Sequence, residues 1–550
     1  MTDWSTAAST GDVSYRLVFG YRDEQEYASA VHELVDDGVA GKMTARDATL
    51  WGAEAESEAG KRLAWVGLAE SSRPLVDEVN SLRDELGARG YDHVVLCGMG
   101  GSSLAPEVIC NTARVELTVL DSSHPDYVSR AVADRLERTV VVVSSKSGGT
   151  VETDSQKRTY EKAFADIGHD PADHIVVVTD PGSPLDESAR EAGYRVFNAD
   201  PEVGGRYSAL TAFGLVPSGL AGADIAGLLD EASAIAPALA ADSVENPALR
   251  LGAILGLANR HGADKVALTD AGSGPVGLGD WIEQLVAEST GKHGSGILPV
   301  VVPTTESPNF DPNTADVVLV TSGNEFVFDS LSPSSRFGAS VDAPLGAALL
   351  LWEYAVPVAG RMIGINPFDQ PDVESAKQAA RDMLGGDQEP PEPDLTDGTV
   401  AVYATPGLLG SDTKGLQGAL TALLDQLDPD TGYLAVHAYL DRVRDASLAQ
   451  VRETLAARTG RPTTFGWGPR FLHSTGQYHK GGPPTGVFLQ ITGEPAADLQ
   501  VPGRPFTFGQ FIAAQAVGDG AVLADHGRPV LRLHLGDRDA DLGRLEGLLR

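Results

Sequence analysis

The sequence predicts an α/β protein with parallel sheets, and two observations support this prediction. Short runs of β-branched residues, such as HVVLC (93–97) and TVVVV (139–143), alternate with segments of helical periodicity. The runs are apolar throughout, which is typical of strands covered by helices on both faces of a sheet. The length of 550 residues indicates about three or four domains.

The pattern of apolar residues divides the chain into four regions. Residues from about 15 to 88 have apolar positions at helical spacing. Strand–helix alternation follows, and it starts again after a helical stretch at about 222–262. The segment 385–397, GGDQEPPEPDLTD, is rich in proline and acid and predicts a linker. We therefore expect an N-terminal helical segment (1–88), a first α/β domain (89–221), a second α/β domain (222–386) and a C-terminal α/β region (398–550).

The charge of the chain argues against two classes of partner. The formal net charge is −35 at pH 7. Nucleic acid and anionic membranes both attract basic surfaces, so we expect neither as a partner. To bind an anionic substrate, the site would need a local positive electrostatic potential that opposes the negative potential of the whole chain.

Cysteine content and the N-terminus indicate a cytoplasmic protein. Cys97 and Cys110 are the two cysteines of the sequence, too few for a disulfide framework in a chain of this length. MTDWSTAAST does not resemble a signal peptide. The longest apolar stretch contains Glu353, Pro357 and Arg361, which favours a buried helix over a membrane span.

Two loops of small and hydroxyl residues follow predicted strands. GMGGSSL (98–104) and SSKSGGT (144–150) each come between a strand and a helix. Free N–H groups and the positive end of the helix dipole meet at such positions, and Ser and Thr add further donors. The loops therefore suit a phosphate group.

Other interpretations of these loops remain open. Small residues can simply turn the chain after a strand. Gly98, Gly100 and Asp121 also fit part of a dinucleotide fingerprint, although Ser103 occupies the position of its third glycine. Neither loop ends in the GK[ST] of a nucleotide P-loop.

Several segments together resemble one family, the glucose-6-phosphate isomerases built from two sugar-isomerase (SIS) domains. The resemblance implies two SIS-type αβα sandwich domains with parallel sheets. The region after residue 390 resembles the tails of the isomerases found alone or fused to transaldolase in high-G+C bacteria. The matching segments are GMGGSSL, SSKSGGTVET, VGGRYSALTAFG (203–214), WIEQLVAESTGKHGSGILP (281–299) and GINPFDQPDVESAK (364–377).

The resemblance also implies a set of site residues. Glu288 would be the base that moves a proton between C1 and C2, and Arg206 would stabilise the enediolate. Lys377 would help to open the sugar ring. Without the family, each of these three residues has a simpler interpretation. Glu288 would be an exposed carboxylate, Arg206 would form a structural salt bridge, and Lys377 would face solvent beside Glu374. The residues that would contact the substrate or its 6-phosphate are Gly101, Ser102, Ser145, Lys146, Ser147, Thr150, Gly205 and Gln370.

One departure from the family concerns the histidine that opens the ring. The sequence has no histidine between Gly294 and Lys377, where the family normally carries it. HSTGQYHKGG (473–482) offers His473 and His479 as replacements, and His293 is a further candidate. Asp372 and Pro371 also differ from the residues usual in the family.

We therefore expect a homodimeric isomerase that interconverts glucose 6-phosphate and fructose 6-phosphate. We expect no metal or redox cofactor, since no cluster of metal-ligand spacing stands out. A dual isomerase that also accepts mannose 6-phosphate and a non-catalytic sugar-phosphate sensor remain alternatives. A dinucleotide enzyme is the third.

Overall fold

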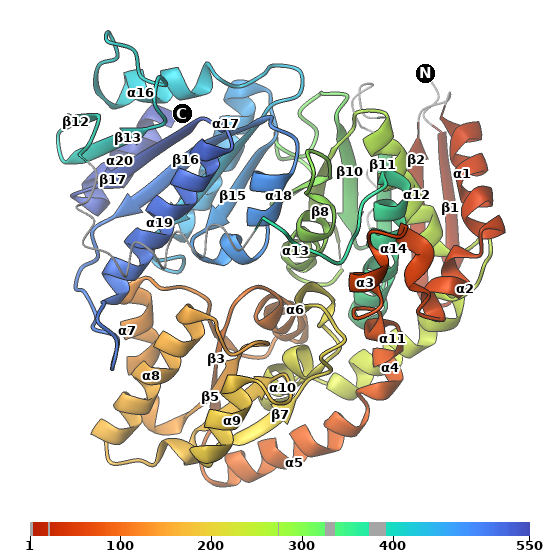
Figure 1. Cartoon of the computed structure of the whole chain (residues 1–550), viewed down its shortest axis with the longest axis horizontal. Coiled ribbons are helices and arrows are strands. Elements are labelled where there is room, and N and C mark those ends of the chain that lie inside the picture. The colour runs from red at the N-terminus through yellow and green to blue at the C-terminus, as the bar shows by residue number, and fades with distance from the viewer. Residues whose placement is uncertain (1–3, 20–22, 273, 325–335, 373–391, 550) are drawn as a thin grey trace.

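The computed structural model describes residues 4–19, 23–272, 274–324, 336–372 and 392–549. Three sheets organise the chain, each with helices packed around it (Figure 1). We call the sheets and their helices the first, second and third domain, in the order of their central strands. Within the described residues, no helix combines the length and the apolar character needed to cross a bilayer.

The first domain contains a five-stranded sheet in which every neighbouring pair of strands is parallel. Its central strands are buried at all positions, as their uninterrupted apolar runs predict. The strands, in spatial order, are β4 (Thr118–Leu120), β3 (His93–Gly98), β5 (Thr139–Ser144), β6 (Ile175–Thr179) and β7 (Arg195–Asn198). The helices are α6 (Leu104–Ala113), α7 (Pro125–Ala133), α8 (Val151–Asp166), α9 (Pro184–Glu191) and α10 (Ala212–Leu220).

The second domain has a six-stranded sheet that includes the N-terminus of the chain. Its order is β1-β2-β11-β10-β8-β9, with β2 antiparallel to β11 and the last four strands parallel. The strands are β1 (Trp4–Thr10), β2 (Val13–Phe19), β8 (Lys265–Asp270), β9 (Leu298–Val301), β10 (Val317–Ser322) and β11 (Phe337–Asp342). The helices are α11 (Ile225–Leu239), α12 (Pro247–Arg260), α13 (Leu278–Thr290) and α14 (Leu345–Ile363).

The hairpin of β1 and β2 corrects the expectation of a helical N-terminus. Val13, Tyr15 and Leu17 are buried and alternate with more exposed residues, which is the period of a strand. Helices begin only at Glu24. They are α1 (Glu24–Asp36), α2 (Val39–Thr44), α3 (Glu56–Ala59), α4 (Leu68–Ser71) and α5 (Pro74–Ala88).

The third domain has a mixed sheet in the order β12-β13-β17-β16-β14-β15. The predicted linker at 385–397 lies partly outside the described residues, and its last three residues form β12 instead. The segment SAKQAARDML (375–384), for which the sequence predicts a helix, also lies outside them. The strands are β12 (Leu395–Asp397), β13 (Val400–Ala404), β14 (Tyr433–Tyr439), β15 (Thr463–Trp467), β16 (Gly486–Gly493) and β17 (Val530–Leu535). The helices are α16 (Gly415–Leu424), α17 (Val451–Thr459), α18 (Gly476–Gly481), α19 (Phe508–Asp525) and α20 (Arg538–Leu549).

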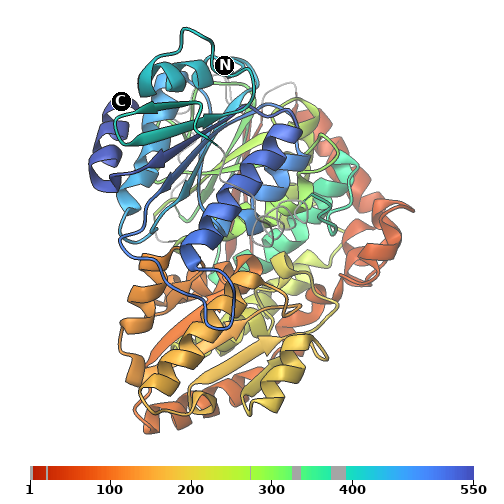
Figure 2. The same ribbon diagram turned by 60° about the vertical axis from the view of Figure 1, so that its left-hand side comes forward.

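The third domain packs closely on the first domain. The segment between β16 and α19 extends over the first domain (Figure 2), and Val501, Phe506 and Phe508 join its apolar cluster beside Tyr160 and Phe164. Burial of this apolar surface stabilises the contact between the two domains.

Ionic contacts add to this interface. Arg470 and Arg442 both pair with Asp121 and Glu107. Burial would raise the pKa of Glu107, but Arg470 and Arg442 outweigh it and lower the pKa to about 2. Asp121 was the residue that could have bound a ribose in a dinucleotide site. Its position between two arginines leaves it committed to the domain contact.

Candidate functional site

Three loops lie beside the carboxyl ends of the first sheet. The first hydroxyl loop (98–103) follows β3, and the second hydroxyl loop (144–150) follows β5. The arginine loop (203–208) contains a short 3-10 helix, Gly205–Tyr207, and contacts the first hydroxyl loop. Ser208 Oγ lies 3.3 Å from the carbonyl oxygen of Gly101, to which it donates. The predicted strand–loop–helix units are thus present, and they place hydroxyl and amide groups at one edge.

Each hydroxyl loop has a position at which glycine is required. A Cβ atom on Gly101 would lie 2.0 Å from the carbonyl oxygen of Gly205, so no side chain fits there. Gly148 has φ +71°, and a Cβ atom on it would lie 2.6 Å from that of Leu185. The glycines therefore allow the backbones to approach each other and the loop to turn tightly.

The hydroxyl side chains of the second hydroxyl loop bond to one another and to the backbone of the loop. Ser145 Oγ donates to Thr150 Oγ1 at 3.1 Å, and the N–H of Gly149 donates to Ser147 Oγ at 3.3 Å. Ser147 is exposed, and Thr150 precedes the first residue of α8. The positive end of the α8 dipole thus adds to the donors of the loop. This combination suits a phosphate group.

Lys146 has a carboxylate partner in this loop. Its Nζ lies 2.7 Å from Asp180 and 3.3 Å from the carbonyl oxygen of Pro201. Burial raises the pKa of Asp180, although Lys146 opposes this shift. An arriving phosphate would therefore compete with Asp180 for the ammonium group.

Arg206 is buried, and all three nitrogens of its guanidinium donate hydrogen bonds. Nε donates to Ser289 Oγ at 2.8 Å, and one terminal nitrogen donates to Gln370 Oε1 at 2.7 Å. The other terminal nitrogen donates to the carbonyl oxygen of Pro367 at 2.6 Å. These bonds fix the plane of the guanidinium. A lysine could not be fixed in this way, because it lacks the rigid, planar fork of donors of an arginine.

Glu288 lies beside Arg206, near the end of α13. One carboxylate oxygen is 3.4 Å from a terminal nitrogen of Arg206, and the other accepts from Gln284 Nε2 at 3.4 Å. The residue is only 9% exposed, so the carboxylate is not the solvated group that sequence alone would favour. A buried carboxylate next to a fixed guanidinium is suited to proton transfer.

Lys292 is a residue of this site that the sequence analysis did not single out. Its Nζ donates to the carbonyl oxygens of Asn366 and Asp369 at 2.7 and 2.6 Å and to Asp369 Oδ1 at 2.7 Å. Burial, with Arg206 nearby, lowers the pKa of Lys292 to about 8. The lysine thereby ties α13 to the segment 364–372, which we call the glutamine loop. Lys292 could have been singled out from the sequence, because it lies inside the matching segment WIEQLVAESTGKHGSGILP (281–299).

The glutamine loop carries Gln370 to the site. Gln370 accepts from Arg206, whereas Phe368 packs edge-on against Trp51 at a ring distance of 4.8 Å. Lys377 lies outside the described residues, so its predicted role stays a prediction.

The three candidate histidines have different surroundings. His473 Nε2 lies 2.9 Å from Glu152 in the first turn of α8, and the His473 carbonyl accepts from Gln284, which also contacts Glu288. His479 is 1% exposed and bonded to Tyr433 within the third domain. Burial lowers the pKa of His479 well below its ordinary value. His293 is exposed and has φ +56°.

The third domain also holds the glutamine loop in place. Gln477 Nε2 donates to Asp372 Oδ2 at 2.6 Å and to the carbonyl oxygen of Gly291 at 2.9 Å. Gln477 Oε1 accepts from the N–H of Asp372 at 2.9 Å. The N–H of Gly294 donates to the carbonyl of Gly481 at 2.8 Å. Helix α18 thus lies against both the end of α13 and the loop that bears Gln370.

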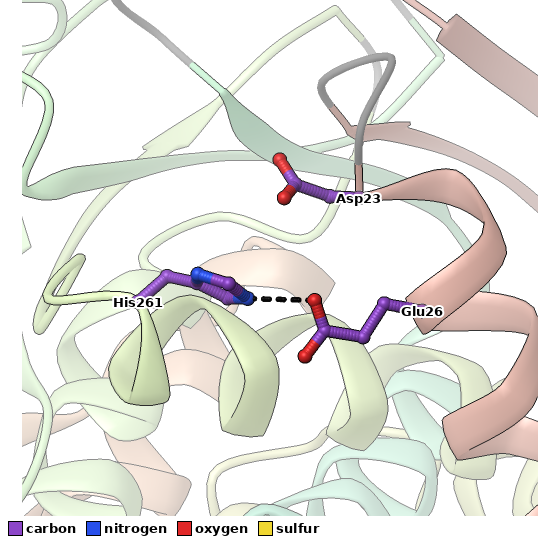
Figure 3. A group of neighbouring side chains, drawn as sticks. All are labelled: Asp23, Glu26 and His261. Carbon is purple, nitrogen blue, oxygen red and sulfur yellow. Dashed lines mark hydrogen bonds and ion pairs between the residues drawn. The ribbon is translucent and has the colours of Figure 1, made fainter.

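One group of possible metal ligands was found in the described part of the chain, away from these loops. Asp23, Glu26 and His261 come together between α1 and the end of α12 (Figure 3). His261 Nε2 lies 2.9 Å from Glu26, and both oxygens of Asp23 accept from Arg336 at 2.8 and 2.6 Å. The ion pairs account for these side chains without a metal.

The comparisons with known proteins agree with this geometry. A family model described as phosphoglucose isomerase matches residues 73–297, which include the hydroxyl loops, Arg206 and Glu288. A glucose-6-phosphate isomerase of Acaryochloris marina is 30% identical over 349 residues, covering 54% of this chain and 66% of that protein. A probable glucose-6-phosphate isomerase of Natronomonas pharaonis is 30% identical over 366 residues, covering 58% of this chain and 85% of that protein.

A solved structure shows the same fold. The crystal structure of a glucose-6-phosphate isomerase from Chlamydia trachomatis superposes with a TM-score of 0.55 at 19% identity. It covers 69% of this chain and 89% of that one. This likeness supports the sandwich architecture of the sheets and helices.

Proposed function

This chain belongs to the glucose-6-phosphate isomerase family, and we propose that it interconverts glucose 6-phosphate and fructose 6-phosphate with Glu288 as the base. The observation that carries the proposal is the contact of Glu288 with Arg206 beside the hydroxyl loops. The match covers 66% of the Acaryochloris protein and 54% of this chain. The activity of the whole chain is therefore a proposal and does not follow from the match alone.

We propose that the hydroxyl loops bind the 6-phosphate. Ser102, Ser145, Ser147 and Thr150 supply hydroxyl groups, and the helix dipole of α8 adds positive potential. These neutral donors allow a chain with a net charge of −35 to bind a dianion. Gly101 and Gly205 keep the neighbouring backbone close enough to border the sugar.

The proton transfer would use Glu288 and Arg206 together. Glu288 removes the proton from C2 of the aldose and returns it to C1, through a cis-enediol. Negative charge develops on the oxygens of this intermediate, and the guanidinium of Arg206 stabilises it. Because Arg206 is already oriented by Ser289, Gln370 and Pro367, little reorganisation is needed during the reaction.

We propose His473 as the group that assists ring opening, with Lys377 as the second. His473 is supported by its bond to Glu152 and by the Gln284 bridge to Glu288. His479 is less suited, because its ring lies in the core of the third domain.

The Glu288→Gln variant tests the assignment of the base. It keeps the size of the side chain and removes the carboxylate. We expect isomerase turnover, measured by coupling the formation of glucose 6-phosphate from fructose 6-phosphate to a dehydrogenase, to fall by about 10²-fold or more. Glu283→Gln, the same substitution on α13, is the control and should retain turnover. Unchanged turnover in Glu288→Gln with normal folding would remove Glu288 from the mechanism.

We further propose a homodimer in the cytoplasm, on the basis of the family. Light scattering on the purified protein would distinguish a dimer of two 57.5 kDa chains from a monomer. Cell fractionation would test the location, and the same isomerase assay with mannose 6-phosphate would test for dual specificity.

A further inference from the structure

The third domain contains a cavity that the proposed reaction does not use. Its volume is about 410 Å³, which falls within the range of small-molecule sites. It opens at the carboxyl ends of β14, β16 and β17, between α19 and the start of α7 in the first domain. The side chains on which the argument depends are His124, Tyr403, Tyr439, Thr492, Arg532 and His534.

The position of the cavity is one at which open α/β sheets bind ligands. The chain leaves β14 towards β15 on one side, whereas β16 leads to β17 on the other. The order of the strands therefore reverses between β14 and β16, which are neighbours in the sheet. Crevices at such a reversal, outside the carboxyl ends of the strands, are the usual ligand sites of this sheet type.

Arg532 is a cation without an acidic partner in this cavity. No carboxylate of the described residues lies within ion-pair distance of its guanidinium, which stacks 4.3 Å from the ring centre of Tyr403. Burial lowers the pKa of Arg532, opposed by Tyr403 and Tyr439. Half-buried arginines normally have a charged partner, because desolvation of an unpaired charge is costly.

His124 provides a second, independent observation. The residue is 1% exposed and lines the cavity, and neither ring nitrogen has a hydrogen-bond partner. Buried polar side chains are normally hydrogen-bonded, so an unpaired imidazole at a cavity wall indicates a missing partner.

The acidic residues of the cavity have partners of their own. Glu494 pairs with His534 Nε2 at 3.0 Å, and His534 Nδ1 lies 3.0 Å from Thr492 Oγ1. Asp498 Oδ1 accepts from the N–H groups of Leu499 and Gly509 at 2.7 and 2.8 Å. Both carboxylates belong to exposed residues, whereas Arg532 and His124 are more deeply placed.

We propose that this cavity binds a small anion bearing a phosphate or carboxylate group, through Arg532 and His124. Arg532 supplies the charge and a fork of donors, and a ring nitrogen of His124 donates a further hydrogen bond. The site is separate from the proposed isomerase site, since it shares no residue with the hydroxyl, arginine or glutamine loops. It joins the first and third domains, so a bound anion would link them.

The His124 ring provides a site-specific test. The full-length protein, labelled with ¹⁵N in its histidines, is titrated with inorganic phosphate and, in a second arm, with malonate. The His124 signals are assigned by their loss in His124→Gln. We expect them to shift saturably with at least one of the two anions, and the tighter one identifies the preferred group.

Three variants make the test decisive. Arg532→Met keeps the length of the side chain and should weaken the titration by about tenfold or more. Ala513→Trp fills the mouth of the cavity without changing charge and should also weaken it. Arg544→Met removes the same charge from the exposed helix α20 and should leave it unchanged. The proposal is overturned if the His124 signals do not move in the wild type, or if they move equally in a folded Arg532→Met or Ala513→Trp variant.

Discussion

Gln477 of the third domain and Asp372 of the glutamine loop bind each other twice, through side chain and backbone. Gln477 Nε2 donates to Asp372 Oδ2 at 2.6 Å, and Gln477 Oε1 accepts from the Asp372 N–H at 2.9 Å. Asp372 is two residues from Gln370, which contacts Arg206. The third domain thus acts on the candidate site through the loop that Gln477 holds.

Gln477→Glu is expected to disturb this loop, because two carboxylates would then face each other. Isomerase kcat/KM should fall by about tenfold, and Asp372→Asn in the same chain should restore most of it, since Asn can donate to Glu. A purely structural role would not produce this rescue. Gln426→Glu on the exposed surface of the third domain serves as the control, measured by steady-state kinetics.

Failure of the double variant to recover, with both proteins folded, would show that the bond to Asp372 is not what couples Gln477 to the site.

Ser147→Ala tests the second hydroxyl loop. Hydrogen bonds to charged groups contribute about 1.5–3 kcal/mol, so the loss of one phosphate contact should raise KM for fructose 6-phosphate by roughly 10-fold or more. Inhibition by inorganic phosphate should weaken in parallel, because the phosphate is the group that Ser147 would contact. Ser188→Ala, on the exposed face of α9, is the matched control. A KM that rises without any change in phosphate inhibition would place the effect elsewhere.

Gly101→Ala tests the close approach of two loops. The added methyl group would lie 2.0 Å from the Gly205 carbonyl oxygen, so the loops must move apart. We expect a loss of about 1–3 kcal/mol in the free energy of unfolding, measured in urea, and a strong loss of isomerase activity. Gly87→Ala in α5 meets nothing within 4 Å and should instead stabilise by up to about 1 kcal/mol. Equal stability of the two variants would contradict the contact.

Much of the first domain could be predicted from sequence, because its strands, loops and helices follow from patterns among neighbouring residues. Each buried strand there is followed within a few residues by its loop and helix, as at β5 and α8. Carboxyl ends of parallel strands share one edge, so the two hydroxyl loops could be expected to come together. Arg206 and Glu288 meet as the family resemblance implied, although 82 residues separate them.

Long-range pairings could not be predicted in the same way. The strand Val13–Phe19 pairs with Phe337–Asp342, more than 300 residues later, and local periodicity gave no sign of that partner. The contacts of Gln477 likewise depend on how the third domain packs. Lys292 was missed because a lysine after a helix normally faces solvent, whereas here three backbone and side-chain oxygens surround it.

Lys292 should make stability depend on pH above neutrality. Its pKa is lowered from 10.5 to about 8 in the folded protein, so between these values the unfolded chain binds more protons. Stability therefore rises with pH across this window, and the penalty is fully present below pH 8. Relative to Lys292→Met, the wild type should gain up to about 3 kcal/mol between pH 8 and 10.5, measured by urea unfolding at several pH values. The other titrating groups are the same in both proteins, so their contributions largely cancel in the difference between the two free energies of unfolding. If this difference does not change with pH, the pKa of Lys292 is not lowered in the folded protein.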